Sequence, residues 1–358
     1  MFKYKPDYEQ AQRRTNAFWN HEELERPLVW MKFPKADAKD FPVKNHDTFE
    51  DYWLDIEYRA EKGAHDMENM VFYAESMPVA YPNMGPEILA AFAGCSYNYT
   101  ETTTWAEPCV FDWKSDKAVI DMKHPLAKKL EDFTSMLLEK ARGNFIVGLT
   151  DLHPGGDHLA ALRDPQNLAM DLLECPEMIV EKLQTSYKEF YAVYDYYVNL
   201  LKNEKMPITT WLPITSETTM YIPSNDFSCM ISNEMFVEFF LDGIVNECRH
   251  YAESIYHLDG PGALRHLDSL LEISELNAIQ WVPGAGREDC TNWLDVYKKI
   301  LSAGKSLIVY PRNMEDLRFL MEHLPAKGVC VQIWPIQKEE EAQNLMQLIN
   351  KWPRRKVY

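Results

Sequence analysis

The sequence predicts an α/β protein, a (β/α)8 (TIM) barrel with an elaborated N-terminal region. Short apolar strands alternate with helices through residues 126–358, which is the pattern of repeated βα units around a parallel sheet. No G-x-G-x-x-G motif follows the first expected strand, which disfavours a doubly wound dinucleotide-binding sheet. The 358 residues contain no low-complexity linker, so we expect one barrel domain over 1–358.

The N-terminal part, residues 1–125, is aromatic and irregular. Its expected elements are a strand at 26–33, a helix at 48–67, an apolar run at 70–85, a short helix at 85–95 and a hairpin within 96–125. One or two strands from this part would complete the set of eight.

The regular βα units of 126–358 follow from their hydrophobic spacing and from Gly and Pro stop signals. The expected strands are 144–153, 207–214, 254–259, 277–284, 306–312 and 329–335. The expected helices are 126–143, two or more within 159–205 with a break near Cys175-Pro176, then 232–252, 264–273, 291–304, 314–328 and 339–352.

The composition narrows the partners of the protein. A net charge of −18 argues against a broad phosphate-binding surface, so we expect no nucleic-acid partner. The acidity is explained by solubility or, alternatively, by attraction for a cationic substrate. No stretch approaches 18 consecutive apolar residues, so no membrane span is expected. These features favour a small-molecule substrate.

The seven cysteines form no C-x-x-C pair, and the N-terminal segment MFKYKPDYEQAQRR is polar. We therefore expect reduced thiols and a cytoplasmic protein. The cysteines are Cys95, Cys109, Cys175, Cys229, Cys248, Cys290 and Cys330.

Large polar and aromatic side chains gather where the expected strands end. In a barrel the active site lies at the carboxyl ends of the strands, so we expect most of these side chains to face one pocket. They are Asp151, His153, Asp157, Trp211, Glu217, His257, Asp259, Gln280, Trp281, Tyr310, Arg312, Gln332 and Trp334.

The segment HLDGPGALRHLD contains His-Leu-Asp twice. The first copy ends a strand, where alternation places His257 and Asp259 on one side. Such a pair can act as acid and base or bind a divalent metal; alternatively, His257 is a hydrogen-bonded core histidine. The second copy begins an amphipathic helix, where His266 faces either the pocket or the helix surface.

Five segments, taken in order, resemble the uroporphyrinogen decarboxylase superfamily: NMGPEILAAFAGC, LTDLHPGGDHLAALRDPQNLAMDLLECPE, NDFSCMISNEMFVEFF, YHLDGPGALRHLD and AIQWVPGAG. The resemblance covers most of the chain and implies a (β/α)8 barrel. The superfamily includes uroporphyrinogen decarboxylases and corrinoid-dependent methyltransferases, which move a methyl group between a methylated corrinoid protein and an acceptor such as coenzyme M or tetrahydrofolate. This chain looks most like the methyltransferase-like branch.

Two departures limit what the resemblance implies. The arginine-rich, substrate-binding segment of the decarboxylases corresponds here to NAFWNHEELERPLVWMKF, with the single arginine Arg26. The thiol-methylating members resemble one another in an H-x-C zinc motif with a later cysteine, whereas this chain has His257-Leu258-Asp259 and carries Cys330 inside a strand. A His257/Asp259 site, with or without Glu217, would be harder than a thiolate site and a poorer match to a thiol-activating zinc centre.

These observations lead to a primary expectation and two alternatives. The first is a methyltransferase-like enzyme that moves a methyl group between a corrinoid (cobalamin) held by a partner protein and a small acceptor or donor. The alternatives are a decarboxylase or lyase acting on a small non-porphyrin substrate, and a ligand-binding barrel without catalysis. The expected catalytic residues are His257, Asp259, Glu217 and Asp226, with Asp226 alternatively a helix cap. The expected substrate-binding residues are Asp151, His153, Trp211, Gln280, Trp281, Tyr310 and Trp334. The expected metal, zinc, would bind His257 and Asp259.

Overall fold

The computed structural model describes residues 2–353 and contains a mostly parallel sheet of seven strands. In spatial order the strands are β2 (Met70–Ala74), β1 (Leu28–Pro34), β11 (Val329–Gln332), β10 (Ser306–Val309), β9 (Ala278–Val282), β8 (Glu253–Asp259) and β7 (Met220–Tyr221). Neighbouring strands are parallel except at the β1–β2 pair, which is antiparallel. The predicted α/β class is confirmed.

Short extended segments continue beyond this sheet. Strand β3 (Val79–Ala80) is parallel to β6 (Ile146–Val147). The backbone N–H of Leu149, just after β6, donates to the carbonyl of Thr209 at 2.8 Å. A separate hairpin joins β4 (Tyr97–Tyr99) to β5 (Thr104–Ala106), as predicted for 96–125.

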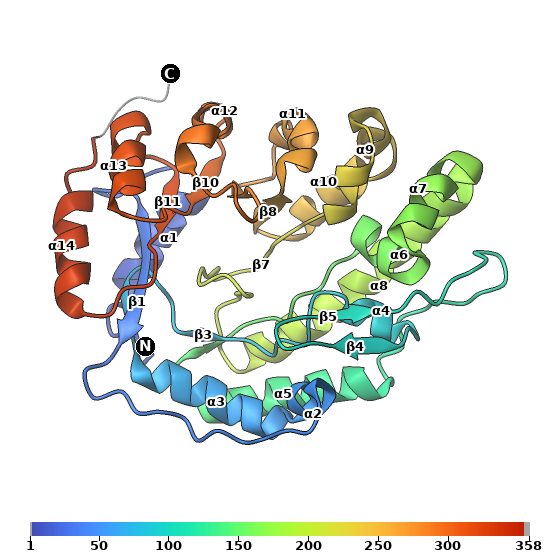
Figure 1. Ribbon diagram of the computed structural model, residues 1–358, viewed down its shortest axis with the longest axis horizontal. Coiled ribbons are helices and arrows are strands. Elements are labelled where there is room, and N and C mark those ends of the chain that lie inside the picture. Colours follow the sequence, from blue (N-terminus) through green and yellow to red (C-terminus); the bar gives the residue numbers. More distant parts are fainter. Residues whose placement is uncertain (1, 354–358) are drawn as a thin grey trace.

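The helices lie around the periphery of the strands (Figure 1). Those of the first half are α1 (Tyr8–Trp19), α2 (Phe49–Leu54), α3 (Ile56–Asn69), α4 (Ile88–Phe92), α5 (Pro125–Ala141), α6 (Gly155–Arg163), α7 (Pro165–Glu174) and α8 (Pro176–Asn203). Those of the second half are α9 (Asn233–Phe239), α10 (Leu241–His250), α11 (Leu267–Leu271), α12 (Leu294–Ser302), α13 (Met314–His323) and α14 (Glu339–Ile349). The 3-10 helices are η1 (Asp226–Met230), η2 (Pro261–His266) and η3 (Cys290–Trp293).

Several predicted elements differ from the observed ones. The expected strand at 207–214 is only an isolated antiparallel bridge between Ile208 and Ser216, because the chain reverses direction within this segment. The expected helix at 232–252 is interrupted at Phe240. The helix at 48–67 divides at Asp55, whose side chain caps α3 by accepting from the N–H of Tyr58. Proline begins both α7 and α8. The break before Pro176 was predicted, whereas the break before Pro165 was not.

Helix α1 was not predicted from the sequence, and it covers the amino end of the sheet. The hydroxyl of Ser306, the first residue of β10, donates to the carbonyl of Phe18 at 2.6 Å. The side-chain amide of Asn277, just before β9, donates to the carbonyl of Trp19 at 3.1 Å. These bonds fix α1 against the beginnings of the parallel strands.

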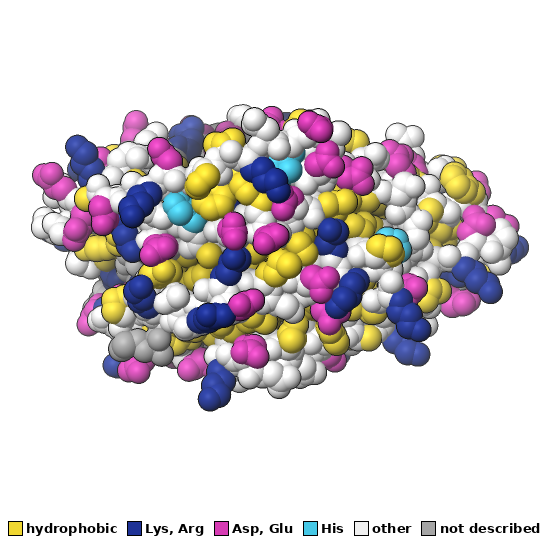
Figure 2. Space-filling view, turned by 90° about the horizontal axis from the view of Figure 1, so that it is seen from below, with side chains coloured by type: hydrophobic (Ala, Val, Ile, Leu, Met, Phe, Trp, Pro, Cys, Tyr) yellow, Lys and Arg dark blue, Asp and Glu magenta, His cyan; other side chains and the backbone are white. Residues whose placement is uncertain are grey.

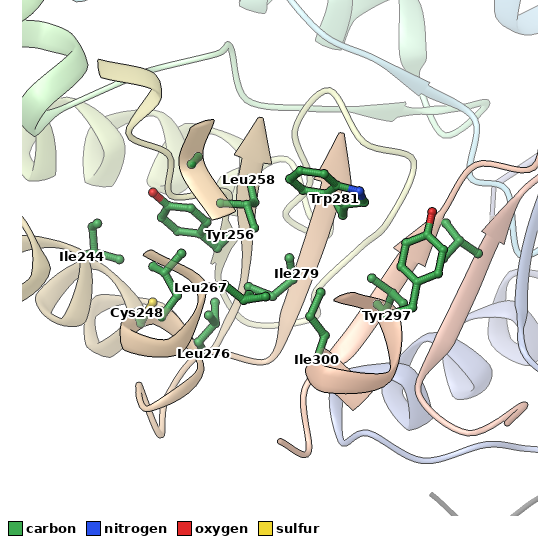
Figure 3. Packing of buried hydrophobic residues seen from close by; sticks show 14 of the residues in the cluster. Ile244, Cys248, Tyr256, Leu258, Leu267, Leu276, Ile279, Trp281, Tyr297 and Ile300 are labelled. Atoms are coloured by element: carbon green, nitrogen blue, oxygen red, sulfur yellow. The ribbon is translucent and has the colours of Figure 1, made fainter. Parts of the chain in front are cut away.

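Both faces of the sheet are buried, as expected for parallel strands between helices. On one face, alternate residues pack against the helices of the second half; Figure 3 shows Tyr256, Leu258, Ile279 and Trp281 beside Ile244, Cys248, Leu267, Leu276 and Ile300. The residues between them form a second apolar cluster on the opposite face, which includes Trp30, Ile255, Ala278, Ile308 and Cys330. The next residues along the strands on this second face define the candidate site.

A buried ion pair connects the beginning of β1 to the end of β2. Arg26 makes two hydrogen bonds to the Glu75 carboxylate, of 2.7 and 2.8 Å, and the side chains are 6% and 1% exposed. The N–H of Val29 also donates to Glu75, at 3.0 Å, and Arg14 lies 3.3 Å from it. Glu75 therefore depends on partners that the protein supplies rather than on water.

The prediction of seven reduced thiols is wrong for one pair, because Cys95 and Cys109 form a disulfide with their Cα atoms 5.2 Å apart. The sequence did not reveal this pairing because the two cysteines are 14 positions apart. They meet only where the chain turns back between α4 and the segment after β5. Among residues 2–353, no helix is both long and apolar enough to cross a membrane. Figure 2 shows one face of the molecule, where acidic and basic side chains are interspersed between small apolar areas.

Candidate functional site

The inward-facing residues at the carboxyl ends of β8, β9, β10 and β11 lie at one end of the sheet. His257 and Asp259 alternate with Leu258, which packs against the helices. On β9, Gln280 is directly opposite His257 in the parallel register. Tyr310 follows β10 on the same side and bonds to Gln280. The sheet register therefore brings these predicted site residues together.

Asp226 joins His257 and Asp259 to form a cluster of three possible metal ligands. Ser224 pairs with His257 in a parallel bridge, and the N–H of His257 donates to the carbonyl of Pro223 at 2.9 Å. This pairing places the beginning of η1, and hence Asp226, beside the end of β8. One ligand atom from each of the three side chains lies within 4.8 Å of the others, which is close to the spacing of ligands that share a divalent cation.

The orientation of the His257 ring is fixed by a hydrogen-bond chain. Nδ1 of His257 lies 2.8 Å from Oε1 of Gln280, whose Nε2 donates to the Tyr310 hydroxyl at 2.5 Å. Because the amide oxygen only accepts, Nδ1 carries a proton, and Nε2 is the ring nitrogen left for another partner. Trp211 packs edge-on against the ring at 5.6 Å between centroids. In a neutral imidazole held in this way, Nε2 is free to bind a metal.

A second polar group lies next to this cluster and is centred on His153. Nε2 of His153 is 2.9 Å from Asp151, and its Nδ1 is 2.5 Å from the hydroxyl of Ser224. The Ser224 hydroxyl in turn donates to Asp157 at 3.1 Å. Burial alone would lower the pKa of His153, but Asp151 and Asp157 outweigh it and hold that pKa well above the usual value. His153 is therefore an imidazolium, and Ser224 gives its proton to a carboxylate instead of acting as an activated nucleophile.

Two carboxyl groups near His153, those of Asp226 and Asp157, have pKa values shifted in opposite directions. Burial raises the pKa of Asp226 to about 6, and the neighbouring Asp157 carboxylate adds to the shift. Burial would also raise the pKa of Asp157, but the charge of His153, whose Nδ1 lies 3.7 Å away, and the hydrogen bond from the N–H of Phe227 lower it. Asp157 therefore balances the imidazolium together with Asp151.

Two cavities lie near the Asp226–His257–Asp259 cluster. The larger has a volume of about 880 Å³ and is lined by Trp211 and Gln280, which contact His257, but by none of the three cluster residues. The smaller, of about 310 Å³, is lined by Asp226, His153 and Asp157. The walls of the larger cavity are mainly aromatic and aliphatic; they include Trp30, Phe72, Met67, Met70, Met77, Trp211, Tyr310 and Trp334.

Two predicted site residues are not at this site. Glu217 is exposed and accepts from Asn16 of α1 at 3.4 Å, while the preceding Ser216 bonds to Glu253 at the first residue of β8. It therefore lies near the amino end of the strand whose carboxyl end carries His257. Trp281 borders the larger cavity, but its side chain is 1% exposed and packs against Trp293 at 5.1 Å, in the layer that faces the helices.

The second His-Leu-Asp copy is structural. His266 is buried and stacked on Phe236 with 4.3 Å between centroids, and its Nε2 lies 2.9 Å from the carbonyl of Ser228. The helix-surface and pocket orientations expected for His266 are both wrong, because the ring fills the space between η1 and α9. Its two ring nitrogens are occupied by Ser228 and by Asn233, at 3.2 Å.

Sequence reasoning did not include three residues that contribute to the site. Ser224 connects His153 to Asp157, and no sequence motif marks it. Trp30 and Lys32 of β1 line the larger cavity. Their signal was a charged residue inside the otherwise apolar strand LVWMKF, whose alternation places Lys32 on the same face as Trp30.

Comparisons with known proteins identify a similar fold. No protein-family model matches the chain, and no curated protein sequence matches it. Among solved structures, the chain is similar to a methyltransferase from Methanosarcina mazei, with a TM-score of 0.60 and 11% identical residues. The superposition covers 95% of this chain and 98% of that chain. The two chains therefore share their fold over nearly their whole length.

A buried carboxyl on α10 gives a testable pH dependence. Glu247 is 1% exposed; burial raises its pKa from 4.5 to about 8, and its nearest donor, the Tyr251 hydroxyl, is 3.4 Å away. The folded protein therefore holds this proton more tightly than the unfolded chain, so stability falls as the pH rises from about 5 to about 8. Glu247→Gln keeps the shape and removes the ionisation, and we expect it to be more stable than the wild type by roughly 2–4 kcal/mol near pH 8.

Thermal unfolding of the wild type and of Glu247→Gln, near pH 5 and near pH 8, measures this effect. Near pH 5 the stability difference between the wild type and Glu247→Gln should largely disappear, since both side chains are then neutral. Glu238→Gln, on the exposed face of α9, is the matched control and should show no such pH dependence. A difference that is the same at both pH values would contradict a neutral Glu247 in the folded state.

Proposed function

We propose that the protein is a methyltransferase-like enzyme of the uroporphyrinogen decarboxylase superfamily, which moves a methyl group between a corrinoid held by a partner protein and a small molecule. The observation that carries this proposal is the Asp226–His257–Asp259 cluster, in which Nε2 of His257 has no hydrogen-bond partner among the described residues. Trp211 and Gln280, which contact His257, line a largely apolar cavity. The fold shared with a methyltransferase supports it.

We also propose that the strands close into a (β/α)8-type barrel. The parallel pair of β3 and β6, and the hydrogen bond from Leu149 to Thr209, supply further paired segments outside the seven-stranded sheet. The apolar cluster on the inner face of the sheet supports a filled barrel interior with the site above it.

The residues present fit a divalent cation such as zinc. Asp226, His257 and Asp259 would hold it, and Gln280 would fix the imidazole through Nδ1. A bound cation of this kind supplies positive charge that lowers the pKa of a coordinated hydroxyl, thiol or water. Two carboxylates and one imidazole form a harder ligand set than the thiolate centre of the thiol-methylating relatives, which favours an oxygen ligand.

The other side chains would bind and orient the reactants. Trp211, Tyr310 and Trp334 enclose the larger cavity and limit access of water. The imidazolium of His153 places a positive charge beside the Asp226–His257–Asp259 cluster. Together with Asp157, it can hold a proton next to this cluster.

A metal-independent decarboxylase or lyase is the second candidate. The observation that favours it is the Asp151–His153–Ser224–Asp157 chain, which faces the smaller cavity and can carry a proton without a metal. In this alternative, His153 would protonate a carbon or oxygen of a small substrate.

Methyl transfer is tested with methylcobalamin and purified protein loaded with zinc. We expect the absorbance of methylcobalamin to change as its methyl group leaves when a suitable hydroxyl, thiol or folate acceptor is present, and the methylated acceptor to form in equal amount. If no acceptor removes the methyl group, either from methylcobalamin or from a methylated corrinoid protein, the proposal fails. Carbon dioxide release from candidate acids would then support the lyase alternative.

A further inference from the structure

The smaller cavity, between α4, α6 and η1, carries more negative than positive charge. Its described lining includes the carboxyl groups of Glu87, Asp157 and Asp226 and the imidazolium of His153, but no lysine or arginine. His153 is already paired with Asp151 and Asp157, at 2.9 and 3.7 Å. Glu87 and Asp226 therefore remain without a cationic partner among residues 2–353.

These two carboxyl groups have few hydrogen-bond partners in the described part of the chain. Glu87, at the start of α4, accepts from the N–H of Ala106 at 2.6 Å, and the Asp226 carboxylate accepts no hydrogen bond. Burial raises the pKa of both groups, and the charge of Asp157 raises both further, which places the three carboxyl groups near one another. The cavity therefore attracts a cation supplied by a ligand.

His158 of α6 is an independent feature of the same cavity. It is 4% exposed and lines the cavity, but neither ring nitrogen makes a hydrogen bond within residues 2–353. Nδ1 is sealed inside the protein, so Nε2 is the ring nitrogen that keeps accessible surface. Burial lowers the pKa of His158 to about 4, so the ring is neutral and Nε2 can accept a hydrogen bond from a donor in the cavity.

The remaining wall limits the size and shape of the ligand. It consists of small or apolar side chains with a single aromatic ring; these are Pro86, Leu89, Ala90, Ala160, Ala161, Pro165, Phe227 and Met230. A volume of about 310 Å³ suits a small molecule. One ring does not form the aromatic cage that binds quaternary ammonium ions, whereas N–H donors match the carboxylates and the imidazole.

We infer that the smaller cavity binds a small aliphatic amine in its protonated form, with the ammonium group among Glu87, Asp226 and Nε2 of His158 and the carbon chain against the alanine and proline side chains. Asp226 belongs both to this cavity and to the proposed metal cluster, so a bound zinc ion would compete with the ammonium group for this carboxylate. Amine binding does not rest on the proposed methyl transfer.

The test measures binding of four probes to the full chain by ligand-observed NMR titration at pH 8, with a chelator present and corrinoid absent. The probes are pentylamine, the neutral pentanol, the anionic pentanoate and the quaternary butyltrimethylammonium. At this pH Asp226, with a pKa of about 6, is ionised and pentylamine is protonated. We expect pentylamine to bind about tenfold more tightly than pentanol, since one charge-assisted contact is worth about that factor. It should also bind more tightly than butyltrimethylammonium, which has the charge but no N–H donor.

Matched variants separate the charge from the fold, because each is judged by the ratio of its affinities for pentylamine and pentanol. Glu87→Gln keeps an acceptor for the Ala106 N–H and removes one charge, so this ratio should fall several-fold. His158→Phe keeps a ring in the wall and removes the acceptor, so the ratio should fall here too. Glu101→Gln, at an exposed position outside the cavity, should behave as the wild type.

The binding and transfer experiments fail independently. The inference is overturned if pentylamine does not bind, if any of the other three probes binds as tightly, or if the preference for the amine survives in the double variant Glu87→Gln/Asp226→Asn. Binding of pentylamine without any methyl transfer would refute the proposed function and keep the ligand class. Methyl transfer by a protein that does not bind pentylamine would refute the ligand class and keep the function.

Discussion

A His257→Ala variant is expected to bind zinc at least about 100-fold more weakly than the wild type and to lose methyl transfer. His257 supplies the one nitrogen ligand of the Asp226–His257–Asp259 cluster, and the two carboxylates alone form a poorer zinc site. Competition with a chromophoric chelator measures the affinity, and methylcobalamin consumption measures the activity. His250→Ala is the matched control, because His250 lies at the end of α10 before β8 begins and pairs with Asp195 on the surface.

Two further variants show whether the cluster is a metal site or an acid–base site. Gln280→Ala removes the acceptor that fixes His257 and is expected to cost about 10- to 100-fold in zinc affinity. Asp259→Cys introduces a softer ligand and should bind zinc more tightly than the wild type. Unchanged zinc affinity in His257→Ala would contradict the metal site, and unchanged activity would contradict any role of the cluster in the reaction.

Glu75→Gln is expected to lower the free energy of unfolding by about 3–5 kcal/mol, because it leaves the Arg26 guanidinium buried beside an uncharged partner. The ion pair makes two hydrogen bonds of 2.7 and 2.8 Å and is almost fully enclosed. Urea unfolding followed by circular dichroism measures the effect. The change falls at the junction of β1 and β2, so the whole sheet should unfold at a lower urea concentration.

An exposed ion pair is the control for this substitution. Glu139→Gln breaks the surface contact with Arg142 and should cost less than about 1 kcal/mol. The double variant Arg26→Met/Glu75→Leu should recover part of the stability, because it removes the buried charge of Arg26 together with that of Glu75. If Glu75→Gln is as stable as the wild type, the ion pair contributes no net stability.

The repeated βα pattern was sufficient to predict the α/β class and most elements after residue 250, because buried parallel strands leave a clear apolar signal. The first half was harder. Helix α1 covers the amino ends of strands that are distant in sequence, and β2 pairs antiparallel with β1, so tertiary contacts determine both.

The site was predicted in part, for similar reasons. Alternation along β8 placed His257 and Asp259 correctly beside each other on one face. The same rule was not applied to β9, where Gln280 and Trp281 were both expected to bind substrate; the two lie on opposite faces, and Trp281 packs in the layer that faces the helices. Glu217 was misplaced because the chain reverses near Ser216, and that reversal depends on contacts with α1 and β8 that no local pattern encodes.

The ion pair at the beginning of β1 has an evolutionary consequence. The strand that Arg26 and Glu75 anchor also carries Trp30 and Lys32 into the larger cavity. Substitutions at the anchor would shift the ligand-facing residues without contacting the ligand, so the tolerance of each position depends on the other. During evolution, substitutions at Arg26 or Glu75 that change the stability of the protein should therefore also change its ligand preference, because one strand carries both sets of residues.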